Sequence, residues 1–98
     1  MRDAQSEGGA RPIYLKRFGY MPTVLRSGPY RFYFYAGDRG EPPHIHVERD
    51  DDTAKFWLSP VRLQTSGGFS RSEIARLLDR VSEYQTQLLE EWNAYFND

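Results

Sequence analysis

Tyr30-Arg31-Phe32-Tyr33-Phe34-Tyr35 is the segment that decides how this chain folds. Its purely apolar side chains, Phe32 and Phe34, alternate with side chains that carry a polar or charged end. A β-strand points successive side chains to opposite faces, so this alternation predicts a strand with one apolar face and one polar, aromatic face.

Two later segments alternate in the same way. His44-Ile45-His46-Val47-Glu48 separates its aliphatic residues from its polar ones, and Thr53–Leu58 separates Ala54, Phe56 and Leu58 from Lys55 and Trp57. If the three segments are neighbouring strands, their apolar side chains form a core and the others form one open surface. We call the second set the open-face residues: Arg31, Tyr33, Tyr35, His44, His46, Glu48, Lys55 and Trp57.

Composition limits the classes of function. The chain has 98 residues, a net charge of −1 and no cysteine, which excludes a disulfide framework, a thiol nucleophile and a cysteine-based metal site. No stretch has the length of a membrane span, and the N-terminus lacks the apolar region of a signal peptide. We therefore expect a soluble, cytoplasmic protein with no membrane partner.

The first twenty residues differ from the rest. They are polar and glycine-containing at first and then basic and aromatic at Ile13–Tyr20, which could add an edge strand. We expect residues 1–20 to be a disordered or loosely attached extension, and residues 21–98 to form a single domain.

Turn signals separate the expected strands. Gly28-Pro29 predicts a hairpin turn after a short strand at Thr23–Ser27, and Pro42-Pro43 places a loop before His44. Val61–Leu63 is a candidate fifth strand at the edge, and Ser66-Gly67-Gly68 is expected to be a flexible connector.

The C-terminal part is predicted to be one long helix, from Arg71 to Phe96. Ser70 and Glu73 match a capping box at its start. Apolar residues recur along it at spacings of three and four, which indicates one buried stripe. The fold class is therefore α+β: a four- or five-stranded antiparallel meander with one long helix packed on its apolar face.

That helix is longer than the sheet it should cover. It would rise roughly 1.5 Å per residue, about 39 Å in all, whereas a strand of five or six residues spans about 17–20 Å. Its far end carries Trp92, Tyr95 and Phe96. Either the helix bends back to the sheet or a second molecule covers this end; we favour a partner surface that includes Trp92.

The open-face residues allow three kinds of chemistry. His44 and His46 lie side by side as in some zinc and iron sites, but the next ligand on that face, Glu48, is too far along the strand, so we predict no metal and no cofactor.

The second kind is cleavage of RNA without a metal. His44 and His46 would supply the acid and the base, and Arg31 and Lys55 would stabilise the charge that develops on phosphate. Exposed aromatic rings would stack bases; the candidates are Tyr33, Tyr35 and Trp57.

The third kind, which we favour, is protein binding. Tyrosine, tryptophan and arginine are the residues enriched at binding hot spots, and this surface needs no special geometry to use them. The predicted binding residues are Arg31, Tyr33, Tyr35, Lys55, Trp57 and Trp92.

Five motifs in a fixed order resemble the bacterial family of unknown function numbered 4160. They are Met21-Pro22-Thr23-Val24-Leu25-Arg26, Tyr30–Tyr35, Pro42-Pro43-His44-Ile45-His46-Val47, Ala54–Leu58 and Gly68-Phe69-Ser70. Members of that family typically begin at the Met-Pro-Thr-Val segment, which agrees with the change of composition near residue 20. Their genes are often found beside a member of the family numbered 2442, in an arrangement that resembles a type II toxin–antitoxin module. The resemblance carries no catalytic residue.

We therefore expect a small bacterial protein that binds a protein partner as one component of such a module. A metal-independent ribonuclease toxin is the alternative. The sequence also leaves open that the protein forms a homo-oligomer or binds RNA.

Overall fold

The computed structural model describes residues 23–96. The predicted N-terminal extension, including the edge strand considered at Ile13–Tyr20, lies outside the described residues.

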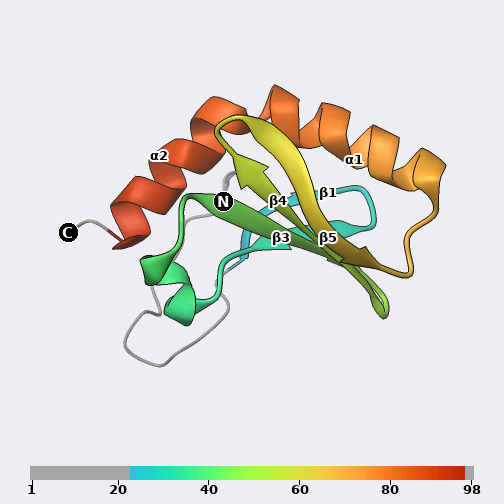
Figure 1. Ribbon diagram of the computed structural model, residues 1–98, viewed down its shortest axis with the longest axis horizontal. Coiled ribbons are helices and arrows are strands. Elements are labelled where there is room, and N and C mark those ends of the chain that lie inside the picture. The colour runs from blue at the N-terminus through green and yellow to red at the C-terminus, as the bar shows by residue number, and fades with distance from the viewer. Residues whose placement is uncertain (1–22, 97–98) are drawn as a thin grey trace, which may run out of the picture.

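Five strands form one antiparallel sheet in which each strand pairs with the next along the chain (Figure 1). They are β1 (Thr23–Ser27), β2 (Tyr30–Tyr33), β3 (His44–Arg49), β4 (Asp52–Leu58) and β5 (Val61–Gly67). The sheet is followed by two helices, α1 (Arg71–Glu83) and α2 (Gln85–Phe96). The predicted α+β meander is therefore confirmed, in its five-stranded form.

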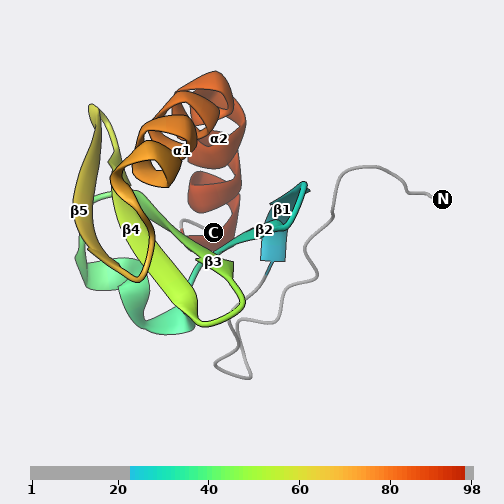
Figure 2. The ribbon, with the colours of Figure 1, turned by 90° about the vertical axis from the view of Figure 1, so that its right-hand side faces the viewer.

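Alternation along the strands places the core as expected. Phe32, Ile45, Val47 and Phe56 are fully buried on the face that the two helices cover (Figure 2). Burying a side chain of this size contributes about 1.5–3 kcal/mol relative to leaving it in water. One face of the sheet is thus the core, and neither α1 nor α2 covers the opposite face.

Two boundaries differ from the sequence-based prediction. β2 ends at Tyr33, and Tyr35 leaves the sheet to start a short 3₁₀ helix, η2 (Ala36–Gly40), where a plain loop was expected. β5 continues to Gly67, so the segment expected to be a connector is mostly strand. Its pairing with β4 supplies the backbone hydrogen bonds that a flexible connector would give to water.

The expectation of one long helix was wrong, because the helical segment breaks at Tyr84. This residue has φ −99° and ψ 11°, and its N–H donates to the carbonyl of Arg80. Just after the break, Nε2 of Gln85 donates to the carbonyl oxygen of Leu58, 2.7 Å away, and so fixes the bend to the end of β4. No helix of residues 23–96 has the length and apolar character needed to cross a membrane.

The bend brings the C-terminal aromatic residues onto the core. The ring of Phe34 lies 5.3 Å from that of Trp92 and 5.9 Å from that of Phe96. Trp92 is only 4% exposed. The helix therefore bends back to the sheet, and no second molecule is needed to cover its far end. Trp92, which was predicted as a binding residue, is a core residue.

The start of α1 is capped by half of the expected capping box. Oγ of Ser70 accepts a hydrogen bond from the backbone N–H of Glu73. The carboxylate of Glu73 does not return to the cap: it accepts from the hydroxyl of Tyr30 at 3.0 Å and pairs with Arg49. Glu73 thereby ties the helix to β2 and β3.

Replacing Trp92 by alanine is expected to lower the free energy of unfolding by about 3–5 kcal/mol, because it removes a large buried side chain between Phe34 and Phe96. Urea unfolding followed by circular dichroism measures the change. Leu63→Ala is the control, since Leu63 is 38% exposed and its loss should change stability by less than about 1 kcal/mol. Equal effects of the two variants would contradict a core role for Trp92.

Candidate functional site

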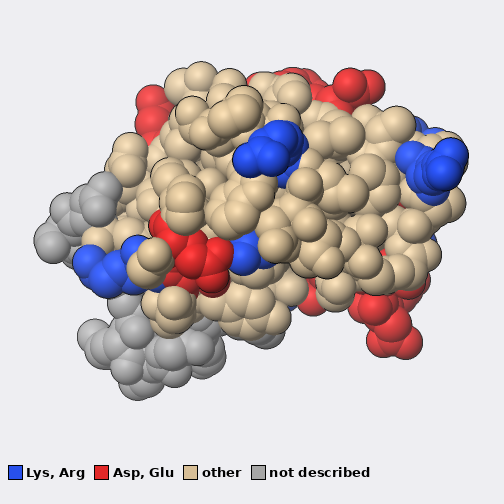
Figure 3. All heavy atoms as spheres, viewed as in Figure 1, with Lys and Arg blue, Asp and Glu red and all other residues tan. Residues whose placement is uncertain are grey.

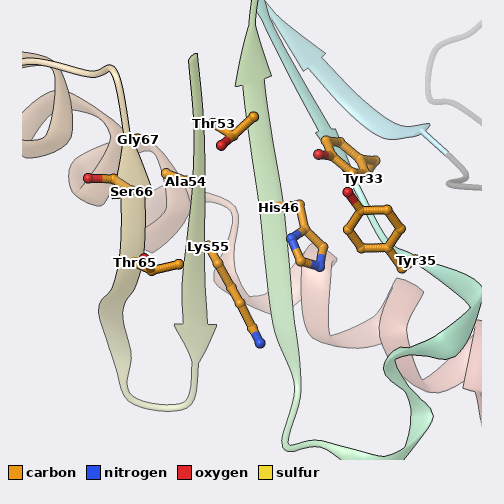
Figure 4. Close-up of a pocket in the computed structure, with 9 residues that line it drawn as sticks. All are labelled: Tyr33, Tyr35, His46, Thr53, Ala54, Lys55, Thr65, Ser66 and Gly67. Carbon is orange, nitrogen blue, oxygen red and sulfur yellow. The ribbon is translucent and has the colours of Figure 1, made fainter. Parts of the chain in front are cut away.

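The open face of the sheet is hollowed into a shallow depression of about 360 Å³. Figure 4 shows its lining: Tyr33 and Tyr35 stand on one side of His46, and Lys55 stands on the other side. The far rim is the edge strand β5, with Thr65. Four of the predicted site residues therefore meet around one depression.

His46 is held by its neighbours. Its ring stacks on that of Tyr33 at a centroid distance of 5.3 Å and meets the ring of Tyr35 edge-on at 4.5 Å. Its Nε2 lies 3.1 Å from Oδ2 of Asp38. The side chain is 13% exposed, so it borders the depression while most of its surface is covered.

His44 is fully buried, although it shares the strand face of His46. Its ring contacts Trp57 on one side and Trp92 of α2 on the other, at centroid distances of 5.7 Å and 5.0 Å. Its Nδ1 is 2.8 Å from the carbonyl oxygen of Pro42 and its Nε2 is 3.0 Å from Oδ2 of Asp38. A substrate in the depression meets His46 and not His44.

Asp38 links the two histidines, and sequence reasoning missed it. η2 carries this residue inward, where the backbone N–H of Tyr35 donates to its Oδ2 at 2.9 Å. Burial alone would raise the pKa of Asp38, but the contacts of its carboxylate with the imidazoles of His44 and His46 and with the backbone N–H of Tyr35 outweigh burial and hold that pKa well below its ordinary value. The signal in the sequence was a single acidic residue in a glycine-flanked turn before the histidine strand.

Asp38, His44 and His46 are also the described residues that could hold a metal ion together. Each offers one ligand atom, and these atoms lie within 4.8 Å of one another.

Two cations of the open face, Arg31 and Lys55, are paired with carboxylates. Arg31 lies 3.1 Å from Glu48 and its guanidinium covers the ring of Tyr33 at 4.4 Å. Nζ of Lys55 lies 2.5 Å from Glu41 and 5.1 Å from the centre of the Trp57 ring. These pairs leave the surface close to neutral, with aromatic rings beneath the charges.

Tyr33 adds a hydrogen-bond donor to this surface. Burial, and then the hydrogen bond and charge of Tyr35, raise the pKa of Tyr33 well above its ordinary value. The phenol therefore stays protonated at neutral pH.

Asp38→Asn is expected to destabilise the protein at pH 7 by about 1–3 kcal/mol, because a charged, buried hydrogen-bond acceptor is replaced by a neutral one. The folded-state pKa of Asp38 lies below its unfolded value of about 3.9. Its stabilising effect is thus fully present above about pH 4 and is lost as the pH falls toward the folded-state pKa.

The measurement is the difference in unfolding free energy between wild type and Asp38→Asn, in buffer containing EDTA, from pH 7 to pH 2. Because His44, His46, Glu41 and Tyr95 are coupled to the charge of Asp38, the comparison is made below about pH 4, where Asp38 itself takes up its proton. A difference that stays constant or grows from about pH 4 to pH 2 would contradict the lowered pKa.

Comparisons with known proteins identify a family for this chain but no individual relative. No match was found among the curated proteins or among the solved structures. A family model described as a domain of unknown function (DUF4160) matches residues 30–93, which include the whole sheet from β2 onward and nearly all of both helices. The chain therefore belongs to the DUF4160 family.

Proposed function

We propose that this protein acts by binding another protein through the open face of its sheet, as one component of a toxin–antitoxin pair. The observation that carries the proposal is the uncovered, aromatic and charge-paired surface around the depression. The helices bury the opposite face, so this surface is the one that an antiparallel sheet leaves to water or to a partner.

Residue types on this surface suit a protein interface. Tyr35 is 42% exposed, and Trp57 is partly exposed beside Lys55. Such rings offer large contact areas and lose little conformational freedom on binding. The hydroxyl of Tyr33 and the imidazole of His46 add directional hydrogen bonds within the depression.

The charge distribution favours protein over RNA as the ligand. Binding to a phosphate backbone draws its free energy largely from cations that replace counterions. Here Arg31 and Lys55 each contact a carboxylate, and the net charge is −1. On the face shown in Figure 3, lysine and arginine form separate small groups and no continuous basic patch.

The toxin–antitoxin role rests on the family. DUF4160 members resemble one half of a two-gene module whose other half belongs to the family numbered 2442. A small single domain with one uncovered face suits such a pair, because a cognate protein could cover that face.

A ribonuclease is the second candidate, and one contact favours it. His46 borders the depression and pairs with Asp38, and Lys55 stands across from it (Figure 4). An imidazole oriented by a carboxylate is a common general base. In such a ribonuclease, His46 is the one histidine that reaches the substrate, because His44 is buried. The second acid–base group is then Tyr33, Tyr35 or Lys55.

The test is binding of a DUF2442 protein, the type of partner that the family resemblance suggests, measured by isothermal titration calorimetry. Tyr35→Ala and Trp57→Ala are expected to weaken the complex by about tenfold or more, which is the loss typical of hot-spot truncation. The matched control is Leu63→Ala, an exposed apolar residue on the other side of the sheet, which should leave the affinity within about threefold.

Growth of cells that express the chain without its partner separates the two candidates. A binding role predicts that cells expressing a folded His46→Ala variant without the partner grow as cells expressing the wild type do. Growth arrest that wild type causes and a folded His46→Ala variant does not would favour the ribonuclease instead.

A further inference from the structure

We propose that Asp38, His44 and His46 form a binding site for one divalent transition-metal ion at the end of β3. This site shares His46 with the partner surface, but partner binding through Tyr35 and Trp57 does not require the ion, so failure of metal binding would leave the proposed partner binding intact.

The first argument is the distances between ligand atoms. Oδ2 of Asp38 lies 3.0 Å from Nε2 of His44 and 3.1 Å from Nε2 of His46. An ion about 2.0–2.1 Å from each ligand requires neighbouring ligand atoms to lie roughly 3–3.4 Å apart. The two distances from Asp38 therefore already match those in a coordination shell, and all three ligand atoms lie within 4.8 Å of one another.

The second argument is the proton on His44. Its Nδ1 is 2.8 Å from the carbonyl oxygen of Pro42, which can only accept, so Nδ1 carries the proton. In the neutral ring Nε2 is then a bare lone pair, and it points toward a carboxylate. Two acceptors at 3.0 Å repel each other unless a cation lies between them.

A proton on Nε2 is the ordinary cation for such a contact, but the geometry does not suit it. Among the described residues, Nε2 of His44 has no aligned hydrogen bond, although Asp38 is near it and the side chain is fully buried. A metal ion lies at the meeting point of several lone pairs and does not need the direct line between two atoms. A metal ion among the three ligand atoms would therefore satisfy Nε2 of His44 without a straight hydrogen bond.

The surroundings hold the three ligands as metal sites usually do. The Pro42 carbonyl fixes the tautomer of His44, the backbone N–H of Tyr35 orients Asp38, and the ring of Tyr33 holds His46. Such outer contacts set ligand orientation and basicity. They exist here in the sheet and in η2 without any ion.

The ligands indicate the class of metal. Two imidazole nitrogens and one carboxylate oxygen suit Zn²⁺ or Fe²⁺, and not Ca²⁺ or Mg²⁺, which prefer oxygen ligands. Three protein ligands leave at least one position for water or a bound molecule. His46 borders the depression, so that position is reached from the open face.

The test is titration of the full-length, EDTA-stripped protein with ZnCl₂, followed by calorimetry and by the melting temperature. We expect one Zn²⁺ per chain with a Kd at or below the micromolar range, and a rise in melting temperature. Asp38→Asn and His46→Gln should each weaken binding by about 100-fold or more, beyond the loss typical of outer contacts.

Glu48→Gln is the matched control. Glu48 is the carboxylate that follows His46 on the same strand face, yet it pairs with Arg31 and is not part of the cluster. Its removal should change the Zn²⁺ affinity by less than about threefold. Equal losses in Glu48→Gln and Asp38→Asn would overturn the site.

A second measurement does not depend on variants that fold. The chain contains two histidines, so both imidazole signals can be followed by NMR. Added Co²⁺ should strongly shift or broaden both rings at one equivalent. No Zn²⁺ binding, or Co²⁺ effects on His46 without His44, would overturn the proposal and leave a protonated His44 paired with Asp38.

Discussion

A mismatch of lengths governs this fold: the helical segment is longer than the sheet that it covers. The helical segment breaks at Tyr84. Next to the break, the side chain of Gln85 donates a hydrogen bond to the carbonyl oxygen of Leu58. The second helix then turns its aromatic side chains onto Phe34 instead of extending past the sheet. The apolar end of the helical segment is thus covered within the chain, and among residues 23–96 the two helices leave the other face of the sheet uncovered.

The same bend also affects the candidate site, because it brings Trp92 of α2 against His44. Trp92 reaches the end of β3 and closes over the ring of His44, which Trp57 contacts from the other side. His44 is removed from water by this contact, while His46 stays at the border of the depression. Two histidines on one strand face therefore have different surroundings, and Asp38 is the group that joins them.

The strand order, the core face and most of the open face follow from alternation in the sequence, because a strand allows only two directions for a side chain. Three features do not follow. The apolar stripe continues across Tyr84 with no proline or glycine, so only the length of the helix hinted at a bend. Tyr35 continues the alternation of its strand but leaves the sheet to begin η2. Asp38 lies in a segment without periodicity, so only the tertiary structure shows which side chain it meets.

Asp38 and His46 are eight positions apart in the chain, and the connection between them joins two strands that pair directly. The three-residue cluster therefore depends on local contacts, which form quickly because little loop entropy opposes them. The histidines can meet the carboxylate once β2 and β3 have paired, before the distant C-terminal helix closes over them. The order of folding would then leave this cluster open to a solute for a time, and Trp92 would seal one side of it as the last helix docks.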